Sequence, residues 1–272
     1  MHHRALALAL AAVASIAPLA AVADSPLKRL TLRHDLLGFE AVGRIDAGDG
    51  FCSGVLIAPD LVLTAAHCLV GSDGTQRDPR AVTFRAGLRD GEAVAERHGV
   101  RAVLHPAYRH DDTDGLRQLT SDLALIRLDA PIPSDLAPPF ATAAPPGAGG
   151  QVSVVSYAAG RSEAPAWQRA CGVAAAGRGA LMMTCDTHFG SSGAPVFDMA
   201  SGRPRIVSLI SRGARENGQT IVYGMNVGPA LDATMAALRA GRGVWPESAV
   251  TARRLSGGSQ GGESGGARFV RP

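Results

Sequence analysis

A serine in a run of small residues is the first candidate for chemistry in this chain. Ser192 lies in the segment 190–195, which reads Gly-Ser-Ser-Gly-Ala-Pro. Small residues predict a tight turn that exposes the serine hydroxyl and lets backbone N–H groups converge on one point. Acyl transfer needs such convergence, because negative charge develops on the carbonyl oxygen in the transition state. A Gly-x-Ser-Gly sequence alone is more typical of a structural loop, so the assignment depends on partners elsewhere in the chain.

Two further segments could supply those partners. His67 follows a short apolar run and two alanines, which predict a strand entering a small-residue turn that holds the imidazole rigidly. Histidine is the side chain best suited to take a proton from a serine near neutral pH. Asp122 immediately precedes the mostly apolar run 123–128, which is expected to be a buried strand. A carboxylate at the end of such a strand is costly to bury without a partner. It could cap a turn, or it could accept a hydrogen bond from an imidazole N–H and stabilise the imidazolium.

The three residues occur in the order His67, Asp122, Ser192, which is the order of the chymotrypsin-like proteases and not that of subtilisins or α/β-hydrolases. The surrounding residues also resemble that family. The segment 51–57, Phe-Cys-Ser-Gly-Val-Leu-Ile, is similar to the strand that carries the disulfide partner of the cysteine after the catalytic histidine. The segment 105–108, His-Pro-Ala-Tyr, resembles one that often precedes the catalytic aspartate.

The resemblance covers about residues 42–227 and implies a fold, an enzyme class and a role for each residue. The fold is all-β, with two six-stranded antiparallel β-barrels (chymotrypsin-like) and a C-terminal helix. The class is serine-type endopeptidase, a hydrolase of protein or peptide substrates that needs no cofactor. Ser192 would be the nucleophile, His67 the general base and then the general acid, and Asp122 the residue that orients His67. The backbone N–H groups of Gly190 and Ser192 would form the oxyanion hole.

The residue before Ser192 separates two branches of this family. In animal trypsins it is an aspartate, which pairs with the amino terminus freed on activation, whereas this chain has Ser191 there. The segment looks closer to the bacterial, V8-like branch. The resemblance therefore predicts that activity does not require a newly freed, buried amino terminus.

The primary specificity pocket is predicted from its position relative to Ser192. Asp186 lies six residues earlier, at the offset where trypsin-like enzymes hold a carboxylate that pairs with a substrate Arg or Lys. A buried carboxylate there, beside Thr187 and opposite Gly213, would favour a long cationic side chain through a charge-assisted hydrogen bond. Glu-specific relatives usually carry a histidine where this chain has Ile210, which argues against an acidic preference. The alternative is a preference for small or apolar residues, with Asp186 an ordinary turn residue.

The amino terminus reads as an export signal. A basic start at residues 1–4 precedes an apolar run to about residue 17, and the segment 21–23 has small residues where signal peptidase needs them. The apolar run is shorter than the ~20 residues of a membrane-spanning helix. We therefore expect cleavage after Ala23 and a secreted or periplasmic protein that is not associated with a membrane.

Export changes the interpretation of the four cysteines, because an even number in an oxidising compartment favours disulfides. Four cysteines allow three pairings, of which the sequential one is simplest: Cys52 with Cys68, and Cys171 with Cys185. A zinc site is disfavoured, because there is no C-x-x-C pair and no histidine other than His67 lies at ligand spacing from a cysteine pair. We expect no bound metal.

Length, charge and patterning suggest two β units in a monomer. The 272 residues suffice for one large all-β domain or two small ones, and the net charge of +3 gives no support to nucleic-acid binding. Short apolar segments punctuated by Gly, Pro, Asp or Ser predict strands at 53–57, 61–64, 81–85, 123–128, 151–157, 206–210 and 221–227. The pattern at 229–240 predicts a helix.

The expected divisions are a signal peptide at 1–23, an N-terminal segment or propeptide at 24–40, a first β-barrel with the His and Asp at 41–130, a Pro- and Gly-rich linker at 131–150, a second β-barrel with the nucleophile and the helix at 151–240, and a flexible tail at 241–272.

Two other functions are compatible with the same sequence. A catalytically silent protein on the protease fold could serve as a binding module, although such proteins usually lack a triad residue. An esterase on the same fold would use nearly identical chemistry and differ only in substrate. The acidic run at 111–115 faintly resembles a calcium loop but lacks the Glu that closes an EF-hand, so we expect a solvated loop there.

Overall fold

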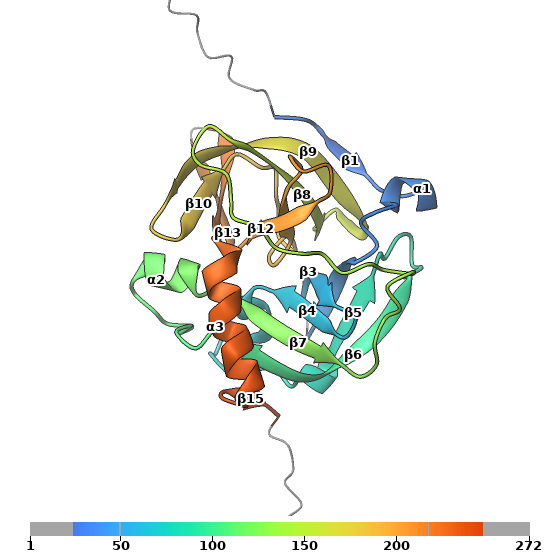
Figure 1. The fold of residues 1–272 in the computed structure, drawn as a ribbon, viewed down its shortest axis with the longest axis vertical. Helices are drawn as coiled ribbons and strands as arrows, with labels where there is room; N and C mark the ends of the chain where they lie inside the picture. Colours follow the sequence, from blue (N-terminus) through green and yellow to red (C-terminus); the bar gives the residue numbers. More distant parts are fainter. Residues whose placement is uncertain (1–23, 49, 217, 247–272) are drawn as a thin grey trace, which may run out of the picture.

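The computed structural model describes residues 24–48, 50–216 and 218–246. The expected signal peptide at 1–23 and residues 247–272 of the expected tail lie outside the described residues. The described chain consists mainly of β-strands in two curled sheets, one above the other in Figure 1. The predicted fold class, a chymotrypsin-like all-β protein with a C-terminal helix, is therefore confirmed, but only the first sheet is a closed six-stranded barrel and the second is a curled half-barrel. Within the described part of the chain, no helix is both long and apolar enough to cross a membrane.

The first sheet is a closed barrel of six antiparallel strands. β2 pairs with β3 and β5, β3 pairs with β4, and β4 pairs with β7. β6 closes the ring because it pairs with both β5 and β7. Side chains alternate across each strand, so Ile45, Phe84 and Ile126 point into the barrel, where they are fully buried. The strands are β2 (Val42–Ala47), β3 (Gly50–Ala58), β4 (Leu61–Thr64), β5 (Val82–Ala86), β6 (Ala95–Leu104) and β7 (Ala124–Leu128).

The second sheet follows the order β12-β11-β8-β9-β10-β14-β13. Its two edge strands, β12 and β13, are consecutive in the chain and are separated only by Ile210 and Ser211. The sheet therefore curls back toward itself, and it encloses a core that includes Val154, Met183 and Val222. The strands are β8 (Gln151–Ala158), β9 (Arg161–Gly177), β10 (Ala180–Met183), β11 (Pro195–Asp198), β12 (Arg205–Leu209), β13 (Arg212–Glu216) and β14 (Gln219–Met225).

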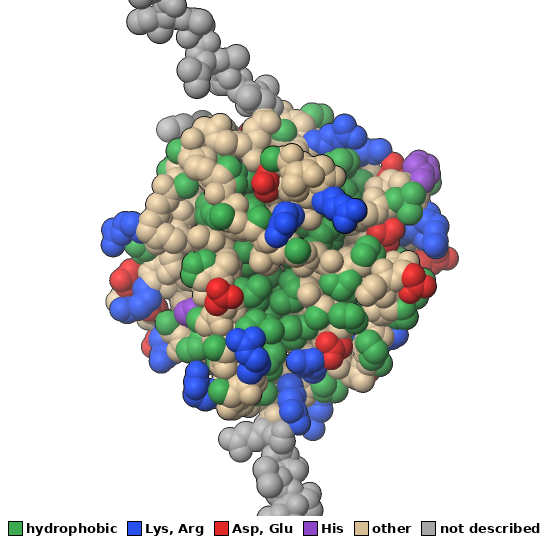
Figure 2. Space-filling model, in the orientation of Figure 1, with side chains coloured by type: hydrophobic (Ala, Val, Ile, Leu, Met, Phe, Trp, Pro, Cys, Tyr) green, Lys and Arg blue, Asp and Glu red, His purple; other side chains and the backbone are tan. Residues whose placement is uncertain are grey.

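A third group of buried side chains joins the two sheets. It includes Leu63 and Leu125 from the first sheet and Tyr157 and Phe197 from the second. The helix α3 (Val227–Arg239) contacts β6 and β7 of the first sheet and β12 of the second. Figure 2 shows hydrophobic side chains gathered around the centre of this face, where α3 lies. The helix and the shared core therefore hold the two sheets in one fixed arrangement.

Both ends of the described chain add short strands to the sheets. The segment 24–40 contains β1 (Leu27–Arg29), which pairs with β9, and the short helix α1 (Arg33–Leu36). Leu30 and Leu36 of this segment are fully buried. The first residues of the expected tail contain β15 (Val244–Trp245), which pairs with β6. The remaining helix, α2 (Gly115–Thr120), lies beside the second sheet.

The seven strands expected from the sequence and the expected helix are present, with ends shifted by at most three residues. The sulfur atoms form the sequential disulfides, Cys52 with Cys68 and Cys171 with Cys185. The first bridge joins β3 to the turn that contains His67. The second joins β9 to the segment that leads to Ser192.

Candidate active site

His67 and Asp122 are brought together by the pairing of β4 with β7. Thr64 at the end of β4 lies opposite Ala124 at the start of β7, so the residues just beyond these ends are neighbours. The Asp122 carboxylate lies 2.8 Å from Nδ1 of His67 through Oδ2. Its other oxygen, Oδ1, accepts the backbone N–H of His67 at 3.0 Å. These two contacts fix the position and the orientation of the imidazole.

The environment of the pair determines which nitrogen of His67 is free. The Asp122 side chain is almost fully buried, and the Ser211 hydroxyl also donates to Oδ2 at 2.5 Å. An ionised carboxylate in this position accepts a hydrogen bond from Nδ1–H, so the neutral imidazole carries its proton on Nδ1 and has a free lone pair on Nε2. Nε2 is therefore the nitrogen that can take a proton from a nucleophile.

Charge and burial act in opposite directions on both groups. Burial alone would lower the pKa of His67, but the charge of Asp122 and its hydrogen bond raise this pKa above the ordinary value of 6.5. Arg212 opposes that rise. Burial alone would raise the pKa of Asp122, but the charge of His67 and hydrogen bonds from His67 and Ser211 hold it below 3.8. Asp122 is therefore ionised near neutral pH.

The loop that contains Ser192 packs directly against the strand before His67. Gly193 has a φ of +75°, and a Cβ atom there would lie 2.2 Å from Thr64 Oγ1 and 2.9 Å from the backbone N of Ala65. Only glycine allows so close an approach. The Gly193 N–H donates to the Ile210 carbonyl at 2.7 Å, which fixes the loop on its other side. The structure thus brings the three predicted triad residues into one region.

Gly190 lies at the start of the same loop with a φ of +93°. A Cβ atom there would lie 2.2 Å from the ring of Phe51, so the position requires glycine. Its carbonyl accepts the Ser53 hydroxyl at 2.9 Å. Among the described residues, the backbone N–H groups of Gly190 and Ser192 have no hydrogen-bond acceptor. Both donors are therefore available to an oxyanion.

A cavity of about 540 Å³ opens beside Ser192. The predicted pocket residues Asp186, Thr187 and Gly213 all line it, together with Ile210. Asp186 is exposed, whereas the sequence suggested a buried carboxylate. The neighbouring Cys185 takes the buried position, in its disulfide with Cys171. Asp186 therefore stands on the cavity wall in contact with solvent.

Residues 52–205 match the family model described as a trypsin-like peptidase domain. The chain belongs to this family. The glutamyl endopeptidase of Bacillus licheniformis is 24% identical over 187 residues, which are 68% of this chain and 56% of that protein. The chain thus matches just over half the length of this relative. The match confirms the predicted relationship to the chymotrypsin-like peptidases.

Two solved structures share the fold of this trypsin-like peptidase. A Glu endopeptidase in complex with MPD has a TM-score of 0.65 and 17% identity, and the match covers 80% of this chain and 98% of that one. The protease Anisep from Arthrobacter nicotinovorans has a TM-score of 0.61 and 18% identity, with 80% and 99% covered. At 17–18% sequence identity, these structural matches establish a shared fold and nothing more.

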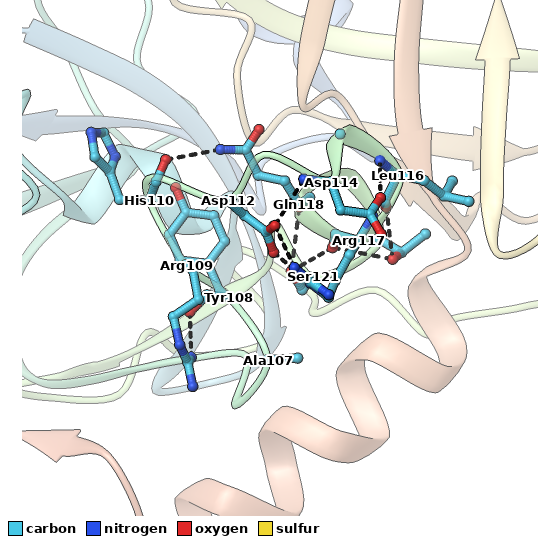
Figure 3. Close-up of polar contacts among 12 residues, drawn as sticks. Ala107, Tyr108, Arg109, His110, Asp112, Asp114, Leu116, Arg117, Gln118 and Ser121 are labelled. Carbon is cyan, nitrogen blue, oxygen red and sulfur yellow. Dashed lines mark hydrogen bonds and ion pairs between the residues drawn. The ribbon is translucent and has the colours of Figure 1, made fainter.

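The acidic run 111–115 is exposed at four of its five positions, as expected of a solvated loop, and it leads directly into α2. Asp114 caps α2, because its carboxylate accepts the backbone N–H groups of Leu116 and Arg117 at 3.1 Å (Figure 3). The Asp112 carboxylate is 2% exposed and binds the Arg117 guanidinium at 2.6 Å. Gln118 donates to the His110 carbonyl at 2.9 Å. The run therefore builds a capped helix at the edge of the site.

That helix forms one wall of a second cavity of the peptidase, of about 220 Å³. The cavity is lined by His67, Asp122, Gln118 and Arg212. Arg212 also lines the cavity beside Ser192 and donates to Gln118 Oε1 at 3.1 Å. No local pattern marked Arg212 as a functional residue, because it simply follows the end of an apolar strand. It places a positive charge between the two cavities.

The ligand atoms of Cys52, His67 and Cys68 lie within 4.8 Å of one another. The two sulfur atoms are joined in a disulfide and cannot act as thiolate ligands. These three residues lie close together because the Cys52–Cys68 disulfide anchors the turn that contains His67.

Proposed function

We propose that this trypsin-like peptidase is an exported serine endopeptidase with a triad of Ser192, His67 and Asp122. The observation that carries the proposal is the Asp122–His67 pair, which lies beside a nucleophile loop whose Gly190 and Ser192 N–H groups are free. In a silent binding module, nothing would require a buried carboxylate, an oriented imidazole and two open donors in one place.

The proposed reaction has two halves. Ser192 Oγ bonds to the scissile carbonyl carbon while Nε2 of His67 takes the hydroxyl proton. The N–H groups of Gly190 and Ser192 stabilise the resulting oxyanion. The C–N bond then breaks as His67 gives its proton to the leaving amine, which leaves an ester on Ser192. Water, deprotonated by His67, hydrolyses that ester and restores the serine hydroxyl.

Export is supported by the sequence at 1–23 and by the two disulfides. Disulfides form and persist in secreted and periplasmic proteins and are rare in the cytosol. Both bridges lie at the proposed site, since Cys68 follows His67 and Cys185 precedes Asp186. Reduction of either bridge would loosen a loop on which the reaction depends.

We further propose cleavage after Arg or Lys. The Asp186 carboxylate lines the cavity beside Ser192, next to the Thr187 hydroxyl. A Cβ atom on Gly213 would lie 3.6 Å from Thr187 Oγ1, so a side chain there would narrow the gap that a long substrate side chain needs. A second candidate, cleavage after Glu, is favoured by Arg212 and Arg215, which line the same cavity. The name of the Bacillus relative points the same way.

The test is hydrolysis by the purified protein that begins at Asp24. Casein, peptides with Arg, Lys, Glu, Ala or Phe before the scissile bond, and matched peptide esters would be compared. We expect casein and peptide hydrolysis, with Arg and Lys preferred. A fluorophosphonate probe should label wild type at Ser192 and fail to label Ser192→Ala. Turnover of esters alone would indicate an esterase, and no turnover at all would indicate a binding module.

A further inference from the structure

The amino-terminal segment docks on the outer side of β9, where it adds a strand to the second sheet (Figure 1). Leu27 lies opposite Gln168, and the pairing is antiparallel. Ser25 extends it, because its N–H donates to the Ala170 carbonyl at 2.8 Å and its hydroxyl accepts the Ala170 N–H at 2.9 Å. Leu30 then enters the core, where it is fully buried. The segment is thus built into the fold.

Gln168 connects this docked segment to the substrate cavity. The side chain is 3% exposed, and both ends of its amide are bonded. Nε2 donates to the Ser25 carbonyl at 3.0 Å, and Oε1 accepts the backbone N–H of Asp186 at 2.7 Å. One buried amide therefore bridges the amino-terminal segment and the residue on the cavity wall.

Asp24 makes a second connection to the same wall. Its Oδ1 accepts the Gly172 N–H at 3.1 Å and the Thr184 hydroxyl at 2.9 Å. Thr184 immediately precedes Cys185, whose disulfide leads back to Cys171 on β9. The wall at 184–186 is therefore held through Gln168, through Asp24 and through the disulfide. Asp24 is also the residue that cleavage after Ala23 would leave at the amino terminus.

We propose that residues 24–29 are a retained support for the wall of the substrate pocket, and that Gln168 is a positioning residue that transmits their docking to Asp186. This rests on the proposed peptidase function but not on which residue the pocket prefers. Without Ser25, the buried Nε2 of Gln168 loses its acceptor, so the amide is free to turn and release the Asp186 N–H. The cavity wall then shifts, while the triad, which lies on other elements, keeps its geometry.

The main test is Gln168→Met, which keeps the length of the side chain and removes its donor and acceptor. Arg169→Met is the matched control, because Arg169 is the next residue on β9 and its exposed guanidinium stacks on Trp167. The measurement is kcat and KM for a peptide with the preferred residue before the scissile bond and for its Ala counterpart. We expect Gln168→Met to lower the preference over Ala by about ten- to a hundredfold, chiefly through KM. The control should keep the wild-type preference.

Two further measurements separate positioning from a general loss of structure. The rate of labelling by a small fluorophosphonate, which does not need the pocket, should stay near that of wild type in Gln168→Met. A protein that begins at Leu27 lacks Asp24 and Ser25 and should lose the same preference. Combining this truncation with Gln168→Met should cost no more than the truncation alone, because the truncation already removes the Ser25 carbonyl that Gln168 binds.

The outcomes distinguish this proposal from the proposed function. An inactive wild type would reject the peptidase assignment. If wild type is active and its preference survives Gln168→Met, or if the losses add in the combined variant, the positioning role of Gln168 would be overturned. The peptidase assignment would stand. If Gln168→Met also lost its fluorophosphonate labelling, the residue would be needed for folding and the positioning role would be rejected.

Discussion

The backbone N–H of Ser53 donates a hydrogen bond to the carbonyl oxygen of Ser192 at 2.8 Å. The Ser53 hydroxyl donates to the Gly190 carbonyl at 2.9 Å, so one residue of β3 holds two carbonyl groups of the nucleophile loop. These bonds hold the loop against β3, while the N–H groups of Gly190 and Ser192, which have no acceptor among the described residues, are left for the substrate. The neighbouring Cys52 is bonded to Cys68, which follows His67. A single stretch of β3 thus positions both loops of the proposed site.

Replacing Ser53 tests this arrangement. Ser53→Ala removes the bond to Gly190 and leaves the buried Tyr157 N–H, which donates to the Ser53 hydroxyl at 3.0 Å, without an acceptor. Direct removal of an oxyanion donor costs about 10²- to 10³-fold in kcat. Because Ser53 acts through Gly190, we expect a smaller loss of kcat, about tenfold, with KM little changed. The free energy of unfolding should fall by about 1–3 kcal/mol.

The control for Ser53→Ala is Ser201→Ala, on an exposed turn. It should leave both kcat and the midpoint of thermal unfolding unchanged. A Ser53→Ala protein with wild-type kcat would show that the loop holds its shape without the hydroxyl.

The sequence predicted the strands and the triad candidates because both have local signals. Apolar runs between Gly, Pro and Asp marked the strands, and the order of His67, Asp122 and Ser192 could be read directly. Ser53 gave no such signal, because its partners Gly190 and Tyr157 lie more than a hundred residues away in the chain.

The strand β9 could not be predicted from the hydrophobic pattern of the sequence. It runs from Arg161 to Gly177 but mixes Ala, Gly and charged residues, so the alternation typical of a strand is weak. Its buried Gln168 reads as a surface residue, because its partners Ser25 and Asp186 come from separate segments. Backbone pairing and long-range hydrogen bonds stabilise this strand, and neither leaves a local pattern.

The acid limb of the pH profile should respond to Arg212. The proposed mechanism requires neutral His67, so it predicts that kcat/KM falls as the pH drops through the pKa of that residue. The positive charge of Arg212 lowers this pKa. Arg212→Gln should therefore raise it and move the acid limb to higher pH. Arg215→Gln, which removes a charge from the same strand, is the control and should leave the limb in place.

Asp122→Asn should shift the limb the other way. It removes the charge that raises the pKa of His67, so the limb moves to lower pH. The Asn amide would also favour the wrong imidazole tautomer. The same Asp-to-Asn change in a chymotrypsin-like triad lowers kcat about 10⁴-fold. A profile recorded from pH 4 to pH 9, a range of about two units or more on each side of the ordinary histidine pKa, would show both shifts. An acid limb that did not move in either variant would exclude His67 as the titrating base.

Activity should not depend on a free amino terminus. Ser191 is buried, and its hydroxyl contacts the His188 N–H at 3.3 Å, the Tyr157 carbonyl at 3.3 Å and the Arg161 guanidinium at 3.4 Å. A serine cannot form the buried ion pair that an aspartate would offer to an amino-terminal ammonium. A short Gly-Ser tag before Asp24 should therefore leave kcat/KM unchanged. If acetylation of the amino terminus abolished the activity of the untagged protein, a carboxylate elsewhere would have to serve as its partner.

The preference for Arg and Lys should reside in Asp186. A hydrogen bond to a charged group contributes about 1.5–3 kcal/mol, so Asp186→Ser should lower kcat/KM for Arg peptides by about ten- to a hundredfold. The Ala peptide makes no such bond, and its kcat/KM should stay the same. Because Asp186 is exposed, high salt should weaken the preference of wild type as well. Asp135→Ser, at another exposed carboxylate, is the control. If the mutant kept the Arg preference, or if wild type instead preferred Glu and Arg215→Gln removed that preference, the guanidinium groups and not Asp186 would set the specificity of the pocket.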